Sequence, residues 1–81
     1  MQIVSLTSRA IKKIKKFDLE YKFAKAKKLF EGDIKHPSLN TELLEPKELS
    51  LYSFRIDRKY RAHFFIVSGK AEVVDITLHY Q

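Results

Sequence analysis

The chain is 81 residues long, which is enough for one domain with a single core and too short for two. It is 44% hydrophobic and 12% aromatic with only two glycines and two prolines, which is typical of a folded chain and not of a disordered one. The absence of cysteine excludes disulfides and thiolate zinc sites. A net charge of +6 favours an anionic partner, either a phosphate backbone or an acidic protein.

No stretch of the sequence resembles a signal peptide or reaches the roughly 20 apolar residues of a membrane-spanning helix. We therefore expect a cytoplasmic protein with no membrane contact. Lysines crowd the first third of the chain, where they either face solvent on helices or contact an anion, and the sequence leaves both interpretations open. They are Lys12, Lys13, Lys15, Lys16, Lys22, Lys25, Lys27 and Lys28.

The first half of the chain predicts a short strand followed by two helices. Residues 2–6 are short and β-branched at their centre, and Thr7 or Ser8 then supplies a helix N-cap. Asp18 is expected to cap the second helix, and Gly32 is expected to end it in a left-handed conformation. In both helices apolar residues recur at three- and four-residue spacing: Ala10, Ile11, Ile14 and Phe17, then Leu19, Phe23, Ala26 and Phe30.

Residues 33–48 contain both prolines and no sustained period, so they predict an extended connection. Residues 51–57, 60–67 and 71–80 alternate between two side-chain sets and predict three strands joined by tight turns. The predicted fold is α+β with β-α-α-β-β-β order, a small, mainly antiparallel sheet packed on an N-terminal helical hairpin. The face under the helices is expected to hold Tyr52, Phe54, Ile56, Tyr60, Ala62, Phe64, Ile66, Glu72, Val74, Ile76, Leu78 and Tyr80, with Val73 on the other face.

The other face of this sheet is polar and must contact solvent or a ligand, because burying an unpaired charge costs several kcal/mol. Two of its arginines lie near one hairpin turn, and guanidinium groups bind phosphate oxygens in a bidentate manner. The alternative is that Arg55 and Arg61 pair with Asp57 and Asp75 across strands. The face as a whole is predicted to collect Arg55, Arg61, His63, Asp75, Thr77 and His79.

Four segments in order resemble the RelE/ParE toxin superfamily, and its RelE, YafQ and YoeB-like branch in particular. They are HPSLNT at 36–41, LYSFRI at 51–56, KYRAHF at 59–64 and VDITLHY at 74–80. The resemblance implies the same topology and a cytoplasmic type II toxin that cuts mRNA at the ribosome and inhibits translation. It further implies an antitoxin partner, with the toxin a monomer alone and part of a hetero-oligomer when bound.

The resemblance also assigns residues. Arg61 matches the catalytic arginine, Arg55 a basic position on the preceding strand, and His79 with Tyr80 a C-terminal pair. Glu45 lies where some relatives keep a catalytic carboxylate. The remaining expected RNA contacts are Lys59, His63, Arg58 and Ser53.

The expected mechanism is a metal-independent endoribonuclease in which the substrate's own 2′-hydroxyl attacks the neighbouring phosphate. Arg61 would stabilise charge on the phosphate, and His79 would act as general acid or base. No cofactor is expected, because two histidines lack a third ligand at zinc spacing. Simpler roles stay open: His79 as a surface residue, His63 as a neighbour of Thr77, Tyr60 as core and His36 as a turn residue.

Two other functions compete with the nuclease. One is an interaction protein, either a ParE-like inhibitor of gyrase or a degenerate module whose basic face only binds its antitoxin. The other is a general RNA-binding domain, whose affinity would fall steeply with salt. Imidazoles on the basic face favour the nuclease, since binding alone does not require them.

Overall fold

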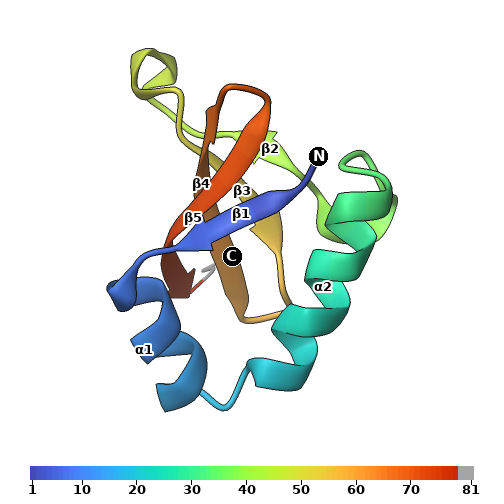
Figure 1. Cartoon of the computed structure of the whole chain (residues 1–81), viewed down its shortest axis with the longest axis vertical. Coiled ribbons are helices and arrows are strands. Elements are labelled where there is room, and N and C mark those ends of the chain that lie inside the picture. Colours follow the sequence, from blue (N-terminus) through green and yellow to red (C-terminus); the bar gives the residue numbers. More distant parts are fainter. Residues whose placement is uncertain (79–81) are drawn as a thin grey trace.

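The structure is a computed structural model that describes residues 1–78. All strands belong to one five-stranded sheet with the order β1-β5-β4-β3-β2, in which β1 is parallel to β5 and the other neighbours are antiparallel (Figure 1). The predicted α+β fold is therefore confirmed. In chain order the elements are β1 (Ile3–Leu6), α1 (Ser8–Lys16), α2 (Glu20–Gly32), the 3-10 helix η1 (Pro37–Leu39), β2 (Glu42–Leu43), the 3-10 helix η2 (Lys47–Leu49), β3 (Tyr52–Arg55), β4 (Tyr60–Val67) and β5 (Lys70–Leu78).

Helix α1 begins as predicted and ends differently. The Thr7 hydroxyl accepts a hydrogen bond from the backbone N–H of Ala10 at 3.2 Å, which is an N-cap. Asp18 does not cap α2: its φ of 60° is left-handed, and the N–H of Leu19 donates to the Ile14 carbonyl at 2.8 Å. This is a Schellman closure, which buries Leu19 against the turn. Helix α2 then starts after Leu19 without a side-chain cap.

The C-terminal end of α2 also differs from the prediction. Gly32 is the last residue of the helix and does not have a positive φ, and Asp33 follows in an extended conformation. The N–H of Asp33 still donates to the Leu29 carbonyl at 2.8 Å, so the last turn is closed without a left-handed residue. None of the helices within residues 1–78 is long and apolar enough to cross a membrane.

The core lies between the two helices and one face of the sheet. Phe30 of α2 contacts Phe54 of β3 and Phe64 of β4, with ring centroids 4.8 Å and 5.0 Å away, the second pair edge-on. All three rings are fully buried. Each aromatic ring buries a large apolar area, so these three rings are a major part of the core. Phe54 and Phe64 therefore lie on the helix face of the sheet, as the alternation of β3 and β4 predicted.

Strand β5 departs from its predicted alternation through a β-bulge. Consecutive residues of β4 pair with Asp75 and Val73, which leaves Val74 as an extra residue. Val73 and Ile76 consequently face the core together and are both almost fully buried. The assignment of Val74 and Glu72 to the helix face, and of Val73 to the polar face, is wrong because a strict two-residue period cannot cross a bulge.

The segment 33–48 is more ordered than the predicted connection. It contains η1, η2 and the two-residue strand β2, in which Glu42 pairs with Ser53 of β3. This additional strand is the edge of the sheet next to β3. The β2 to β3 connection projects from the molecule beside the β4–β5 hairpin (Figure 1).

At the opposite edge, helix side chains bind the free backbone groups of the sheet. Strand β5 extends beyond β1, and there the Thr7 hydroxyl donates to the Val74 carbonyl at 2.8 Å and Lys13 Nζ donates to the Ile76 carbonyl at 3.1 Å. On β1, the N–H of Ile3 donates to a carboxylate oxygen of Glu31 at 2.9 Å. These contacts occupy backbone N–H and C=O groups of the sheet edge that would otherwise be free to pair with a strand of another chain.

Candidate functional site

Within residues 1–78, the polar face of the sheet collects the residues predicted for it. Arg55, Arg61 and Thr77 are directly opposite one another on β3, β4 and β5. Two residues along each strand lie Ser53, His63 and Asp75, which are likewise opposite one another. Since residues two apart share a face, these six side chains lie together on the face away from the aromatic core.

Arg61 is the centre of this face and is deeply buried, with only 3% of its surface exposed. Its Nε donates to the Ser53 hydroxyl at 2.9 Å, and its Nη2 donates to the Asn40 carbonyl at 2.6 Å and to the Ser53 carbonyl at 3.3 Å. A carboxylate oxygen of Glu42 lies 3.6 Å from Nη2. The side chain thus reaches across β3 to the segment around β2.

The guanidinium of Arg61 has one donor group to spare. Among the described residues its Nη1 is buried without any hydrogen-bond partner. Burial lowers the pKa of Arg61, and the charge of Glu42 opposes this shift while that of Arg55 adds to it. Arginine nevertheless stays charged in proteins, and a buried cationic donor without an acceptor is rare. An anion would satisfy it once the side chains that cover Nη1 move aside.

Arg55 differs from Arg61 although the two are opposite each other on neighbouring strands. It is half-buried, and its side chain makes no hydrogen bond or ion pair within residues 1–78. Strand β2 ends before it reaches Arg55, so this arginine lies at an open part of the sheet edge. In the following turn Arg58 and Lys59 are exposed. This end of the face therefore offers cationic groups that solvent and a ligand can reach.

The alternative pairing of Arg55 and Arg61 with Asp57 and Asp75 is wrong. Asp57 accepts instead from Lys22 Nζ at 2.9 Å and shapes the β3–β4 turn by accepting from the N–H groups of Lys59 and Tyr60, each at 2.8 Å. Asp75 lies 2.8 Å from Lys13 Nζ. Each acid thus pairs with a lysine of a helix. The predicted pairing considered only residues on the strands and therefore missed these lysines.

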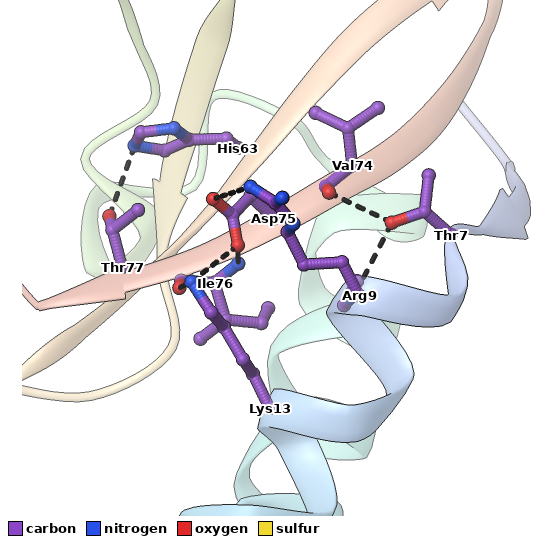
Figure 2. A network of polar contacts seen from close by, with 9 residues as sticks. Thr7, Arg9, Lys13, His63, Val74, Asp75, Ile76 and Thr77 are labelled. Carbon is purple, nitrogen blue, oxygen red and sulfur yellow. Dashed lines mark hydrogen bonds and ion pairs between the residues drawn. The ribbon is translucent and has the colours of Figure 1, made fainter.

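His63 and Asp75 form a second cluster on the same face (Figure 2). His63 Nε2 lies 3.1 Å from the Thr77 hydroxyl, so the simpler role predicted for this histidine, a neighbour of Thr77, is confirmed. Burial lowers the pKa of His63; Asp75 opposes that shift, and the charges of Arg61 and Lys13 add to it. The imidazole is therefore neutral at neutral pH and able to accept a proton.

Asp75 is held as a carboxylate. Burial alone would raise its pKa, but the hydrogen bonds from Lys13 and from the N–H of Ile76, together with the charges of Lys13 and Arg9, lower it below the usual value. Beside this cluster lies a cavity of about 390 Å³, bounded by His63, Phe65 and the first residues of α1. The polar face thus continues from Arg61 into a hollow next to a neutral imidazole.

The remaining predicted site residues lie elsewhere. Glu45 is exposed in the connection that follows β2, at the opposite end of β3 from Arg55. The carboxylate that approaches Arg61 is Glu42, which the sequence argument placed in a loop. The sequence offered no signal for it, because strand β2 has only two residues and is too short to show a strand period. His79 and Tyr80 lie outside the described residues.

Two more of the simpler roles are confirmed. Tyr60 stacks on Phe17 with ring centroids 4.9 Å apart, and so belongs to the packing between β4 and α1. His36 is a turn residue, because its Nδ1 accepts from the N–H of Ser38 at 3.2 Å. Within residues 1–78 no three histidine or acidic side chains gather as metal ligands would.

No family model matches the chain, and no curated protein sequence matches it. Solved structures do match. A YoeB/ParE toxin from Agrobacterium tumefaciens superposes with a TM-score of 0.74 at 18% identity, over 99% of this chain and 100% of that one. The YoeB dimer from Staphylococcus aureus gives 0.75 at 16% identity over 98% of each chain. A chain of the YoeB-YefM complex from the same organism gives a TM-score of 0.72 at 16% identity, over 99% of this chain and 100% of that one. At these identities the likeness shows the fold, which is the one predicted from the resemblance to the RelE/ParE toxins.

Proposed function

We propose that this chain is the toxin of a toxin–antitoxin pair, and that it is a metal-independent endoribonuclease acting on mRNA at the ribosome. The observation that supports it best is the unpaired, buried Nη1 of Arg61 beside the accessible Arg55, on a face that also holds a neutral imidazole. The full-length likeness to YoeB and ParE toxins adds the biological setting.

In this proposal the phosphate that is attacked binds at the open end of the polar face. Arg55 contacts it first, because Arg55 is accessible and has no side-chain partner within residues 1–78. Arg61 then donates from Nη1, once the side chains that cover this nitrogen have moved aside, while Ser53 and Asn40 hold its other nitrogens in place. Two guanidinium groups suit the charge that develops on the equatorial oxygens in phosphoryl transfer. Arg58 and Lys59 bind the flanking phosphates.

The RNA supplies both the nucleophile and the leaving group of the reaction. Its 2′-hydroxyl loses a proton and attacks the adjacent phosphorus, the bond to the 5′-oxygen breaks, and that oxygen takes up a proton. The products are a 2′,3′-cyclic phosphate and a 5′-hydroxyl end. His79 keeps the general acid–base role expected from the resemblance, and Tyr80 a stacking role. His63, neutral and half-buried beside Thr77, is the second imidazole on this face.

The partners follow from the same proposal. One of the matched structures is a heterotetrameric complex of the YoeB-YefM toxin-antitoxin, and another is a YoeB dimer. We infer that this chain binds an acidic antitoxin as a hetero-oligomer in the cytoplasm and acts as a monomer when released. Its +6 charge suits both an acidic antitoxin and ribosomal RNA.

A second candidate function is inhibition of gyrase without RNA cleavage. It is favoured by the likeness to a protein described as a YoeB/ParE toxin. This function needs a basic binding surface and no imidazole. The two functions differ in what changes first after expression: mRNA ends in one, DNA supercoiling in the other.

Controlled expression in a bacterial host tests the proposal. Wild type should arrest growth and produce new mRNA 5′-ends within translated codons, with plasmid supercoiling unchanged. Arg55→Ala should abolish both effects, whereas Lys28→Ala, which removes an exposed lysine of α2, should behave as wild type. Growth arrest with altered supercoiling and intact mRNA would contradict the nuclease and support the gyrase inhibitor.

A further inference from the structure

The cavity next to His63 differs from the rest of the polar face in the side chains that line it. Leu51 and Val74 supply aliphatic walls, and Phe65 supplies an aromatic ring. At about 390 Å³ the cavity is at the small end of the range of about 300–1,000 Å³ usual for ligand sites. One flat ring system fits this space, whereas a partner helix with anchors at i, i+4 and i+7 needs a longer groove.

Phe65 is the phenylalanine that the core does not use. The chain has six phenylalanines, and among residues 1–78 the other five each contact at least one further aromatic ring. Phe65 contacts no other ring within that range. Because Phe64 faces the helices, the next side chain on β4 points to the polar face. The Phe65 ring is half-buried at the wall of the cavity, so it offers part of a flat apolar surface to a ligand.

The polar side of the cavity has hydrogen-bonding capacity to spare (Figure 2). Asp75 Oδ1 accepts from Lys13 Nζ and from the N–H of Ile76, each at 2.8 Å. Within residues 1–78 the Asp75 Oδ2 has only the guanidinium of Arg9 nearby, 3.9 Å away, which is too far for a hydrogen bond. His63 uses only its Nε2 within the same residues. A ligand in the cavity would therefore meet one free carboxylate oxygen and one free imidazole nitrogen.

These groups select a neutral ligand that carries an N–H donor. The Asp75 carboxylate would repel an anion, and a wholly apolar ligand would strip water from Oδ2 without replacing its hydrogen bond. A nucleobase satisfies both sides of the cavity, because it presents apolar faces for stacking and N–H groups on its edge.

The cavity also lies within reach of a base whose phosphate is bound at the two arginines. His63 and Phe65 follow Arg61 at two-residue intervals on one face of β4, roughly 7 Å and 13 Å along the strand. A nucleotide whose phosphate is held by Arg55 and Arg61 can thus extend its base toward Phe65. Arg9 lines the same cavity with a side chain that is 71% exposed, and can contact the next phosphate.

We propose that this cavity is a nucleobase subsite, and that it prefers a base with an exocyclic amino group, which is adenine, cytosine or guanine, over uracil. The base would stack on Phe65, its amino group would donate to Asp75 Oδ2, and His63 Nδ1 would bond to the next polar atom of the base edge. Uracil has no amino group and projects only carbonyl oxygens, which would face the carboxylate. This inference rests on the proposed function for the presence of RNA at this face.

Fluorescence anisotropy with uncleavable RNA tests the subsite without any assay of activity. The probes are labelled single-stranded hexanucleotides with 2′-O-methyl riboses, which lack the attacking hydroxyl. Their bases are all adenine, all uracil, or all unsubstituted purine, which is adenine without its amino group and keeps the same stacking area. Wild type should bind the adenine probe about tenfold more tightly than the other two, as one hydrogen bond to a charged group allows.

Two pairs of variants locate the effect. Phe65→Leu should weaken binding of the adenine probe by about tenfold, because stacking on the ring is lost, whereas Phe65→Trp should bind as wild type. Asp75→Asn should lower the ratio of adenine to uracil affinity by about fivefold or more, since an amide also offers N–H groups to the uracil oxygens. Its matched control is Asp57→Asn, which removes the same charge from another lysine-paired aspartate and should leave that ratio unchanged.

Equal affinity of wild type for the adenine and purine probes would overturn the proposal. So would binding of the adenine probe by Phe65→Leu within about threefold of wild type, with urea denaturation to check that the variant is folded. If Phe65→Leu does not fold, the ratio in Asp75→Asn decides the same question. An equal fall of the ratio in Asp57→Asn would also overturn the proposal, because charge alone would then explain the preference.

Mapping of mRNA ends on programmed ribosomes separates this inference from the proposed function. Wild type should cut next to adenine, cytosine or guanine at one fixed position, and Asp75→Asn should also cut where uracil takes that place. If the probes bind in the expected pattern and no mRNA is cut, the nuclease proposal fails and the subsite stands. If wild type cuts as readily next to uracil as next to adenine, the subsite is wrong and the nuclease stands.

Discussion

The two faces of the sheet are buried by different means. On the helix face, three phenylalanine rings pack on one another, and the contact between their apolar surfaces keeps water out. On the polar face, Arg61 is almost as deeply buried, yet hydrogen bonds from its guanidinium to Ser53 and Asn40 hold it there. Apolar burial tolerates imprecision, whereas a buried cation requires named acceptors at fixed positions. Fixed acceptors therefore hold the Arg61 side chain in one position, and within residues 1–78 its Nη1 is the nitrogen left without an acceptor.

The largest effect should come from the helix face. Phe30→Ala should lower the free energy of unfolding by about 3–5 kcal/mol, because it removes the ring that contacts both Phe54 and Phe64. Phe65→Ala, on the polar face and only half-buried, should cost about 1 kcal/mol. Urea denaturation measures both. Similar losses for the two variants would show that the faces are not packed differently.

Replacing the buried arginine should be the next largest effect. Arg61→Met keeps the apolar stem and leaves the acceptors of Ser53 and Asn40 without a donor, so we expect a loss of about 2–3 kcal/mol in unfolding free energy. Arg55→Met is the matched control and should stay within about 0.5 kcal/mol of wild type. If both variants lose the same stability, Arg61 is not held as described.

The edge contact of Lys13 should contribute less. Lys13→Met removes the donor to the Ile76 carbonyl and the partner of Asp75, both part-exposed, and should cost about 1 kcal/mol. Lys12→Met changes an exposed lysine of the same helix and should be neutral within about 0.5 kcal/mol. Chemical denaturation of the pair at low and high salt measures the difference. If Lys13→Met leaves the unfolding free energy unchanged, this contact does not stabilise the β5 edge.

The smallest effect on stability should be a pH dependence. Because the pKa of His63 is lowered below its ordinary 6.5, the unfolded chain binds the proton more readily, and stability contributed by neutral His63 is lost as pH falls below about 6.5. His63→Gln should therefore flatten the decline in unfolding free energy between pH 7 and 5. The carboxylate of Asp75 acts in a lower window, below 3.8. An unchanged slope in His63→Gln would contradict the burial of this imidazole.

The sequence predicted what depends on local period. Alternation in β3 and β4 placed Phe54 and Phe64 in the core and Arg55, Arg61 and His63 on the other face, and a threonine before an apolar helix predicted the Thr7 cap. These signals are local, since neighbouring side chains in a strand must alternate and a helix start must supply an acceptor.

What the sequence could not predict depends on contacts between distant segments. The bulge at Val74 is set by how β5 meets β4, and one inserted residue reverses the faces beyond it. Two of the groups that contact Arg61, the Asn40 carbonyl and the Glu42 carboxylate, lie about twenty residues before it, in a segment with no period of its own. Whether an arginine on a polar face is open or buried is therefore a tertiary property, and only the structure distinguishes Arg55 from Arg61.

The most direct test of the central claim is single-turnover mRNA cleavage on programmed ribosomes by wild type, Arg55→Ala and Arg55→Lys. Our account predicts that Arg55→Ala unfolds at the same urea concentration as wild type but cleaves about 10²–10³-fold more slowly, as loss of an electrostatic donor does. Arg55→Lys should recover part of the rate, because it restores charge without the fork. A rate for Arg55→Ala within about threefold of wild type would contradict the claim that this arginine receives the phosphate.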